Sequence, residues 1–276
     1  DVSRVIIQPR KKDQIVIIYI DEKTKEHQFS GLDNVFDHDL EIGELDKDYI
    51  LLNDYLILDG FHLNAAIQAA KWMKDAGKRV ILNGAKPLDS LWPPKIHQLV
   101  PYSDVIICGS GFISLLSGKN NLDDAAKWVF DLGPELIIET DGPNGSHTIT
   151  PNDKFYTPAF DIDVVDSTGA GDVFFGAYTA GLAYKFDLHE LSIFSSAAAA
   201  ISCRKIGGRS GIPTLSEIEI FLSERLNDTR FLDAILHNNP LEINSIPIPL
   251  MLKPDIYTDP HISYHTAFDL LLAIED

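Results

Sequence analysis

The sequence predicts an α/β fold in which a mainly parallel central sheet is covered by helices on both faces. Short apolar runs, typical of buried strands, alternate with segments of helical periodicity. The helical segments are about 10–15 residues long, as expected for the crossovers that join parallel strands. Glycine ends several of them, as Gly77 does after residues 63–76 and Gly133 does after residues 122–132.

The chain opens with strand-like segments. Residues 5–8 and 14–21 are apolar runs separated by a polar turn, and residues 22–30 are compatible with a third, more polar strand. Residues 33–48 are acidic and irregular. We therefore expect a small group of strands over residues 1–32, ahead of the main domain.

Strands and helices alternate through the main domain, and residues 33–226 are expected to form one α/β core. The predicted strands are 55–59, 79–82, 104–108 and 136–139, and the predicted helices are 63–76, 122–132, 172–184, 188–205 and 215–226. Beyond them, residues 227–276 form a tail of unclear role, in which prolines interrupt the pattern and only 264–274 is again predicted to be helical.

Composition excludes several classes of protein. A formal net charge of −18 argues against a nucleic-acid binder, which needs a basic face to contact phosphates. No apolar run reaches the roughly 18 residues of a membrane span. Cys108 and Cys203 are too few for a disulfide framework and form no CxxC metal motif, so a reducing, cytoplasmic location is expected.

The most informative segment is a turn of small residues that runs directly into an apolar helix. Its sequence is Asp166-Ser167-Thr168-Gly169-Ala170-Gly171-Asp172. The small side chains allow a ligand to approach the free backbone N–H groups at the helix start, where the helix dipole favours an anion. Asp172 falls in the first turn, beside that anion. This layout suits phosphoryl transfer, with fixed donors for the phosphoryl group and a base for the attacking hydroxyl.

This segment resembles the D-[TS]-T-G-A-G-D signature of the PfkB carbohydrate kinases, a ribokinase-like family. The resemblance implies a ribokinase-like three-layer sandwich with a small β lid, which residues 1–32 would form. It also implies ATP and Mg²⁺ and a small-molecule sugar as acceptor. By resemblance, the anion hole is formed by Gly169, Ala170 and Gly171, and the catalytic base is Asp172. Asp166 and Thr168 resemble positions that in some members hold a monovalent cation such as K⁺.

Further segments are similar to this family. The segment Thr140-Asp141-Gly142-Pro143-Asn144-Gly145 resembles its T-x-G-x-x-G turn, which implies that Thr140, Gly142 and Gly145, with Thr168, contact the nucleotide. Residues 197–208, leading into 212–214, resemble the late helix and loop that cover the adenine. Residues 58–62 and 208–213 look closest to the ketohexokinase-like and sulfofructose-kinase-like branches. Lid strands often pair across a dimer in this family, which implies a homodimer.

The sequence also departs from the family pattern. Many members have N-x-x-E after the strand predicted at 104–108, with the Glu acting near Mg²⁺, whereas this chain has Gly109-Ser110-Gly111-Phe112. The metal ligands therefore stay unassigned. The family also begins with a strand and a Gly-Gly substrate motif that this sequence lacks, so about the first third of a typical member is expected to be missing. The resemblance covers roughly residues 1–226.

Alternatives remain open at this stage. Gly109-Ser110-Gly111-Phe112-Ile113-Ser114 is a near miss to the dinucleotide fingerprint G-x-G-x-x-G and would indicate a dehydrogenase. A P-loop is disfavoured, because Gly118-Lys119-Asn120 lacks its spacing and its Ser/Thr. The main prediction is an ATP-dependent kinase of a ketose or related sugar. A nucleoside kinase of the same fold and a non-catalytic nucleotide or sugar binder are the alternatives.

Overall fold

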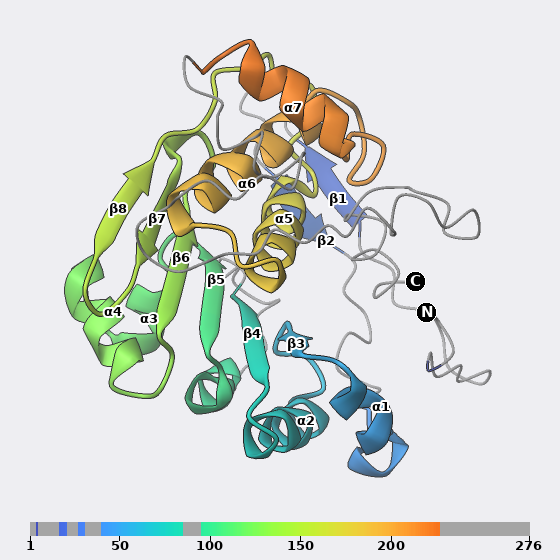
Figure 1. The fold of residues 1–276 in the computed structure, drawn as a ribbon, viewed down its shortest axis with the longest axis vertical. Coiled ribbons are helices and arrows are strands. Elements are labelled where there is room, and N and C mark those ends of the chain that lie inside the picture. The colour runs from blue at the N-terminus through green and yellow to red at the C-terminus, as the bar shows by residue number, and fades with distance from the viewer. Residues whose placement is uncertain (1–3, 5–16, 21–26, 31–39, 85–94, 227–276) are drawn as a thin grey trace. The chain divides into compact units, whose positions relative to one another are not determined.

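The computed structural model describes residues 4, 17–20, 27–30, 40–84 and 95–226. They contain a two-stranded and a six-stranded sheet (Figure 1). The predicted strand at 5–8 and the predicted helix at 264–274 lie outside the described residues. Within them, no helix is long and apolar enough to cross a lipid bilayer.

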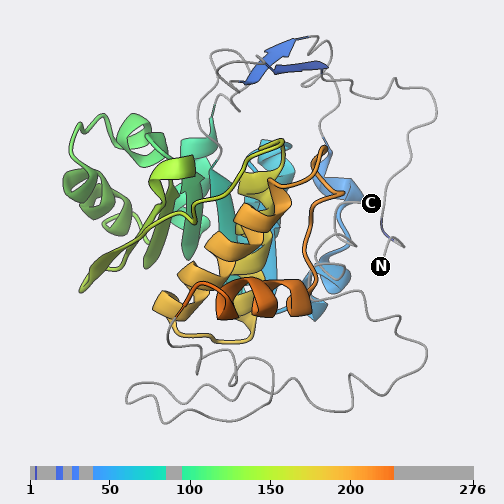
Figure 2. The same ribbon diagram turned by 90° about the horizontal axis from the view of Figure 1, so that it is seen from above.

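The two-stranded sheet pairs β1 (Ile17–Ile20) with β2 (His27–Ser30) in antiparallel orientation (Figure 2). Ile17 lies opposite Ser30, and Ile20 lies opposite His27. Strands were predicted over the wider ranges 14–21 and 22–30. The side chains of Ile17 and Tyr19 are exposed on β1.

The six-stranded sheet follows the chain, in the order β3-β4-β5-β6-β7-β8. Its strands are β3 (Tyr55–Leu58), β4 (Arg79–Gly84), β5 (Val105–Gly109), β6 (Leu136–Thr140), β7 (Ser146–Ile149) and β8 (Lys154–Thr157). The pairings of β3 with β4, β4 with β5 and β5 with β6 are all parallel. The α/β class expected from the alternation is therefore confirmed.

The helices include several that the sequence pattern did not predict. They are α1 (Lys47–Leu52), α2 (Leu63–Asp75), α3 (Phe112–Ser117), α4 (Leu122–Phe130), α5 (Ala170–Ala183), α6 (Leu188–Ser202) and α7 (Leu215–Ser223), with 3₁₀ turns η1 (Ile42–Glu44), η2 (Ile96–Tyr102) and η3 (Gly142–Asn144). The acidic, irregular segment at 33–48 in fact ends in η1 and the start of α1. Helix α5 begins at Ala170, two residues earlier than predicted, because Gly169 caps it.

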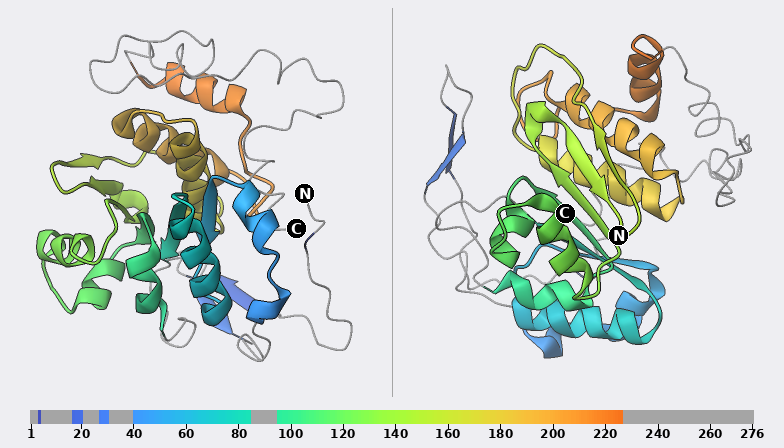
Figure 3. Two further views of the ribbon diagram at one scale, coloured as in Figure 1. Left: turned by 60° about the horizontal axis from the view of Figure 1, so that its bottom comes forward. Right: turned by 90° about the vertical axis from the view of Figure 1, so that its left-hand side faces the viewer.

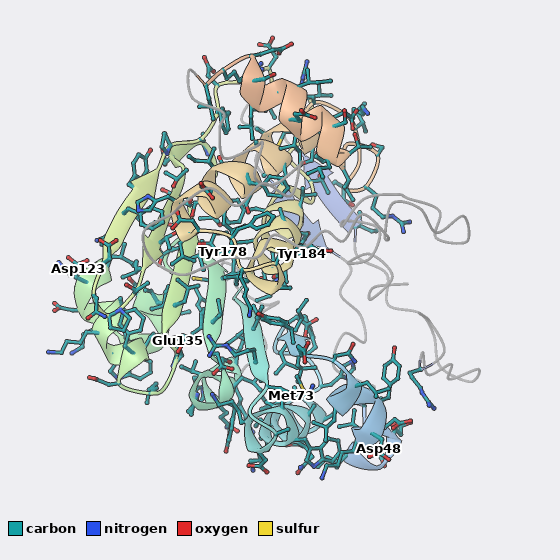
Figure 4. All side chains as sticks on the ribbon, viewed as in Figure 1. Asp48, Met73, Asp123, Glu135, Tyr178 and Tyr184 are labelled. Carbon is teal, nitrogen blue, oxygen red and sulfur yellow. The ribbon has the colours of Figure 1, made fainter. Side chains whose placement is uncertain are left out.

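The chain divides into two compact units, which we describe separately. The strand unit contains Asp141 and the described residues before it, together with His147–Lys154. Its core is formed by apolar residues of β4, β5 and β6 and of the helices beside them, with Met73 among its fully buried side chains (Figure 4). Lys74 and Arg79 surround the buried Asp104, which also accepts a hydrogen bond from the Val80 N–H.

The signature unit contains Gly142–Ser146 and the described residues from Phe155 onward. Helices α5 and α6 pack side by side in it (Figure 3). Ala197 and Ala198 are fully buried, as expected from small residues that allow close helix packing, and Tyr178 is buried with them. Helix α7 begins with a capping box, in which Thr214 and Glu217 exchange hydrogen bonds with each other's backbone N–H groups.

Candidate active site

The predicted anion-binding turn lies at the start of α5. Gly169 caps this helix with φ of +77°, a left-handed conformation that favours glycine. The Val173 N–H donates to the Gly169 carbonyl at 2.9 Å. Of the described residues, none accepts a hydrogen bond from the Gly171 or Asp172 N–H. These two donors at the positive end of a 14-residue helix are available to an anion.

Different physical causes explain why glycine occupies positions 169 and 171 of this turn. A Cβ at Gly169 would lie 2.8 Å from the Gly208 carbonyl oxygen, so the close approach of the two backbones requires glycine there. A Cβ at Gly171 would meet no atom within 4 Å. Packing therefore does not explain Gly171, and the open space above it leaves its N–H accessible to a ligand.

Asp172 is the third residue of α5, and its side chain is open to solvent. The surrounding protein nevertheless desolvates the carboxylate and thereby raises its pKa above the ordinary value for aspartate. A raised pKa makes the carboxylate a stronger base. Such a group can accept the proton of an approaching hydroxyl.

Asp166 connects the turn to the loop after α6. Its Oδ1 accepts the Thr168 N–H at 2.9 Å, and its Oδ2 accepts the Gly207 N–H at 2.8 Å. The N–H groups of Val165 and Asp166 both donate to the Cys203 carbonyl, at 2.9 and 3.1 Å. The sequence pattern placed Asp166 at a monovalent cation, but it did not reveal this bracing role toward Gly207. The dipeptide Gly207-Gly208 was the available signal for a close backbone approach.

Gly142 and Gly145 lie in the same unit as the anion-binding turn, within and after η3. Both have positive φ, of +51° and +85°. A Cβ at Gly145 would lie 2.2 Å from the Thr157 carbonyl oxygen, so chain packing alone explains this glycine. Thr140, the remaining predicted nucleotide contact, belongs to the strand unit, where its Oγ1 donates to the Cys108 carbonyl at 3.2 Å.

The dinucleotide alternative is disfavoured by a carboxylate. Gly109-Ser110-Gly111 does follow β5 and precede α3, as that alternative requires. However, the buried Glu139 places Oε1 2.8 Å from the Gly111 N–H, at the start of this six-residue helix. That N–H already has an acceptor and is not available to a pyrophosphate. Phe112 is fully buried and packs on Gly84, whose Cβ would lie 2.6 Å from the phenyl ring.

No group of three or more His, Cys, Asp or Glu side chains within the described ranges is arranged to hold a metal ion. Divalent cations that work on nucleotides are usually held by the phosphates and one or two carboxylates, with water completing the shell. The open anion-binding turn beside Asp172 fits a cation of that kind, bound through the nucleotide.

Comparison with known proteins gives a consistent result. The family model described as pfkB family carbohydrate kinase matches residues 1–215. Ribokinase from Staphylococcus aureus is 28% identical over 179 aligned residues, covering 62% of this chain and 57% of that protein. Aminoimidazole riboside kinase from Salmonella typhimurium is 30% identical over 170 residues, covering 58% of this chain and 53% of that protein.

The fold comparison agrees. The crystal structure of ribokinase from Thermotoga maritima matches with a TM-score of 0.62 and 26% identity, covering 75% of this chain and 69% of that chain. The ribokinase-like architecture expected from the sequence is thus confirmed. The chain spans little more than half the length of the two sequence relatives described above.

Proposed function

The chain belongs to the PfkB family of carbohydrate kinases, and from this premise we propose that it transfers the γ-phosphoryl group of ATP to a hydroxyl of a ketose or related sugar. The observation that carries the proposal is the start of α5. Two N–H groups that have no acceptor among the described residues lie next to a carboxylate of raised pKa. An acceptor for anions and a base for a hydroxyl are the two groups that this reaction needs.

In the proposed reaction, Asp172 accepts the proton of the substrate hydroxyl as its oxygen bonds to the γ-phosphorus. The bond from that phosphorus to the β–γ bridging oxygen breaks, and ADP leaves. The N–H groups of Gly171 and Asp172, with the dipole of α5, stabilise the negative charge on the transferred group. Mg²⁺ bound to the ATP phosphates would neutralise part of that charge.

Asp166 and Thr168 would hold the monovalent cation in this proposal. Each oxygen of Asp166 accepts one backbone N–H, and a carboxylate oxygen can make more than one contact at a time. The carboxylate can therefore brace the loop and bind K⁺ at once.

A nucleoside kinase is the second candidate, and one observation favours it. The match to a kinase that is named for a riboside is of the same quality as the match to ribokinase. The two candidates share the start of α5 and differ in the acceptor. A non-catalytic nucleotide binder is the third reading, although such a protein has no use for a base at residue 172.

The test is a coupled ADP-release assay with MgATP against ketoses, aldoses, polyols and ribosides. Turnover with a sugar or riboside identifies the acceptor class, and Asp172→Asn should remove that turnover while MgATP binding persists. Asp163→Asn is the matched control, since it removes an exposed carboxylate just before the signature. Binding of MgATP without turnover on any acceptor would contradict the kinase and favour the binder.

A further inference from the structure

A glutamate lies next to the end of a strand whose preceding residues are apolar. Residues Leu136–Ile138 of β6 are buried in the core, and Glu139 follows them with only 7% of its surface exposed. Glutamate is almost never buried to this degree unless it is paired. No cationic side chain within the described part of the chain forms an ion pair with Glu139, so its burial needs an explanation.

The two oxygens of this carboxyl group differ in their contacts. Oε1 accepts the Gly111 N–H at 2.8 Å, which satisfies the left-handed glycine that begins α3. Oε2 is buried, and no described residue donates a hydrogen bond to it. A buried carboxylate oxygen without a donor is costly, whereas the neutral acid leaves a smaller unsatisfied polarity.

Burial is the largest influence on the pKa of Glu139, and nearby charges and a hydrogen bond modify it. Burial raises its pKa, and the negative charge of Asp141 raises it further. Lys154 on β8 and the hydrogen bond from Gly111 lower it by less than burial raises it. Cys108, which lies opposite Glu139 in the β5–β6 register, has its own pKa raised by burial and stays a neutral thiol.

The same contact belongs to a small network at the carboxyl ends of β5 and β6. The Ser110 N–H donates to the Thr140 carbonyl at 2.7 Å, and the Thr140 hydroxyl donates to the Cys108 carbonyl at 3.2 Å. The hydrogen bond from Gly111 to Glu139 is the third link. Ligands of parallel α/β sheets bind at this end of the strands. Glu139 thus holds a turn that also fixes Thr140.

We propose that Glu139 is a positioning residue, which works as a neutral carboxylic acid to hold the Gly109–Gly111 turn and Thr140 in place for ATP. The link to ATP rests on the proposed function, in which Thr140 contacts the nucleotide. The neutral state of the acid does not depend on that function. The two parts therefore have separate tests.

The first test compares the melting temperature of the wild type and Glu139→Gln from pH 5 to pH 9. A folded-state pKa above the unfolded value means that stability is lost as pH rises through the folded pKa. Glutamine keeps the shape and the acceptor but cannot ionise. We expect nearly equal melting temperatures at pH 5 and an advantage for Glu139→Gln that grows as pH rises and exceeds about 4 °C at pH 9.

Glu135→Gln is the control for this test, because it removes an exposed carboxylate at the other end of β6 (Figure 4). It should show no advantage that grows with pH. A difference between Glu139→Gln and the wild type that stayed constant over the range would overturn the neutral acid. This readout needs no turnover, so it is independent of whether the chain is a kinase.

The second test measures MgATP affinity by calorimetry in Glu139→Gln and Glu139→Ile. Isoleucine fills the space but leaves the Gly111 N–H without its acceptor. We expect MgATP to bind about five- to tenfold more weakly to Glu139→Ile, the equivalent of one hydrogen bond, with glutamine restoring most of the loss. Equal affinities in both variants and the wild type would overturn the positioning role. A large loss in Glu139→Gln would overturn it too, since the charge itself would then matter.

Discussion

Two helices of this molecule begin with similar glycine-containing turns but differ in whether the N–H groups at their starts have acceptors. Gly109-Ser110-Gly111 leads into α3 and Gly169-Ala170-Gly171 leads into α5, and both helices are capped by a glycine with positive φ. At α3 the Gly111 N–H is satisfied by Glu139 from a neighbouring strand. At α5 the N–H groups of Gly171 and Asp172 find no acceptor among the described residues, and the Asp172 carboxylate lies beside them.

The comparison teaches that a glycine pattern alone does not define an anion site. The deciding feature is whether an acceptor from the protein itself forms hydrogen bonds with the N–H donors at the helix start. At α3 a buried carboxyl group of the protein accepts the Gly111 N–H, whereas at α5 the small residues leave the Gly171 and Asp172 N–H groups open. The following predictions test that distinction, from the largest expected effect to the smallest.

The same chemical change should have very different consequences at the two helix starts. Asp172→Asn removes the proposed base and should lower kcat by about 10²–10⁴-fold. Glu139→Gln, which keeps an acceptor for Gly111, should lower it by less than about tenfold. Steady-state kinetics on the acceptor found in the panel makes the comparison. Similar losses in the two variants would contradict the distinction between an open and a closed site.

The capping glycines should differ in how strictly they are required. Gly169→Ala combines a left-handed conformation with a contact to the Gly208 backbone, and we expect a loss of about 2–4 kcal/mol in unfolding free energy. Gly111→Ala has the same conformation but open space around the new methyl group, so the loss should be about 1–2 kcal/mol. Urea denaturation measures both. A larger loss in Gly111→Ala would show that the Gly208 contact is unimportant.

Gly171→Ala should separate binding from stability. The residue lies within α5 in open space, so alanine should leave the unfolding free energy unchanged or raise it by about 0.5 kcal/mol. The methyl group obstructs the approach to the free N–H groups, and MgATP should bind about five- to tenfold more weakly. Calorimetry with MgATP checks this. Unchanged affinity would mean that the open space over Gly171 is not part of the nucleotide site.

The start of a third helix, α6, extends the comparison to the pH dependence of stability. Glu190 is the third residue of α6, as Asp172 is of α5, but Asp187 caps α6 with its own side chain. Burial, with the charge of Asp187, raises the pKa of Glu190 to about 7. Because the folded pKa lies above the unfolded value, stability should fall as pH rises through about 7. Glu190→Gln should remove this dependence in melting curves at pH 6 and pH 8, and identical pH profiles would contradict it.

Much of the architecture could be predicted because its causes are local. Alternating apolar strands and helices indicated the parallel sheet, and Gly77 and Gly133 marked turns after helices. The strands β7 and β8 were missed because they are four residues each and mix polar with apolar side chains, so neither has a clear period. Helix α1 was missed because its N-cap residue, Asp46, lies in an acidic segment and does not stand out from the other acidic residues there.

The candidate site likewise has features that could be predicted from the local sequence and features that could not. The turn at 166–172 was predictable because its glycines, its helix and its acid are contiguous in sequence. The Asp166–Gly207 and Gly169–Gly208 contacts join residues about forty positions apart in the sequence. A local sequence pattern does not predict contacts between residues so far apart. Glu139 was predicted only as the end of a strand, since its partner Gly111 lies on another strand's turn.

The strict chain order of the large sheet has a consequence for how the molecule is made. Each of β4, β5 and β6 pairs with the strand synthesised just before it, so the sheet can grow at one edge as the chain leaves the ribosome. The bracing of the turn at Asp166, in contrast, must wait until Gly207 has emerged. We therefore expect nascent chains ending near residue 160 to protect β3–β6 from proteolysis, and the turn at residues 166–172 to become ordered only in longer chains.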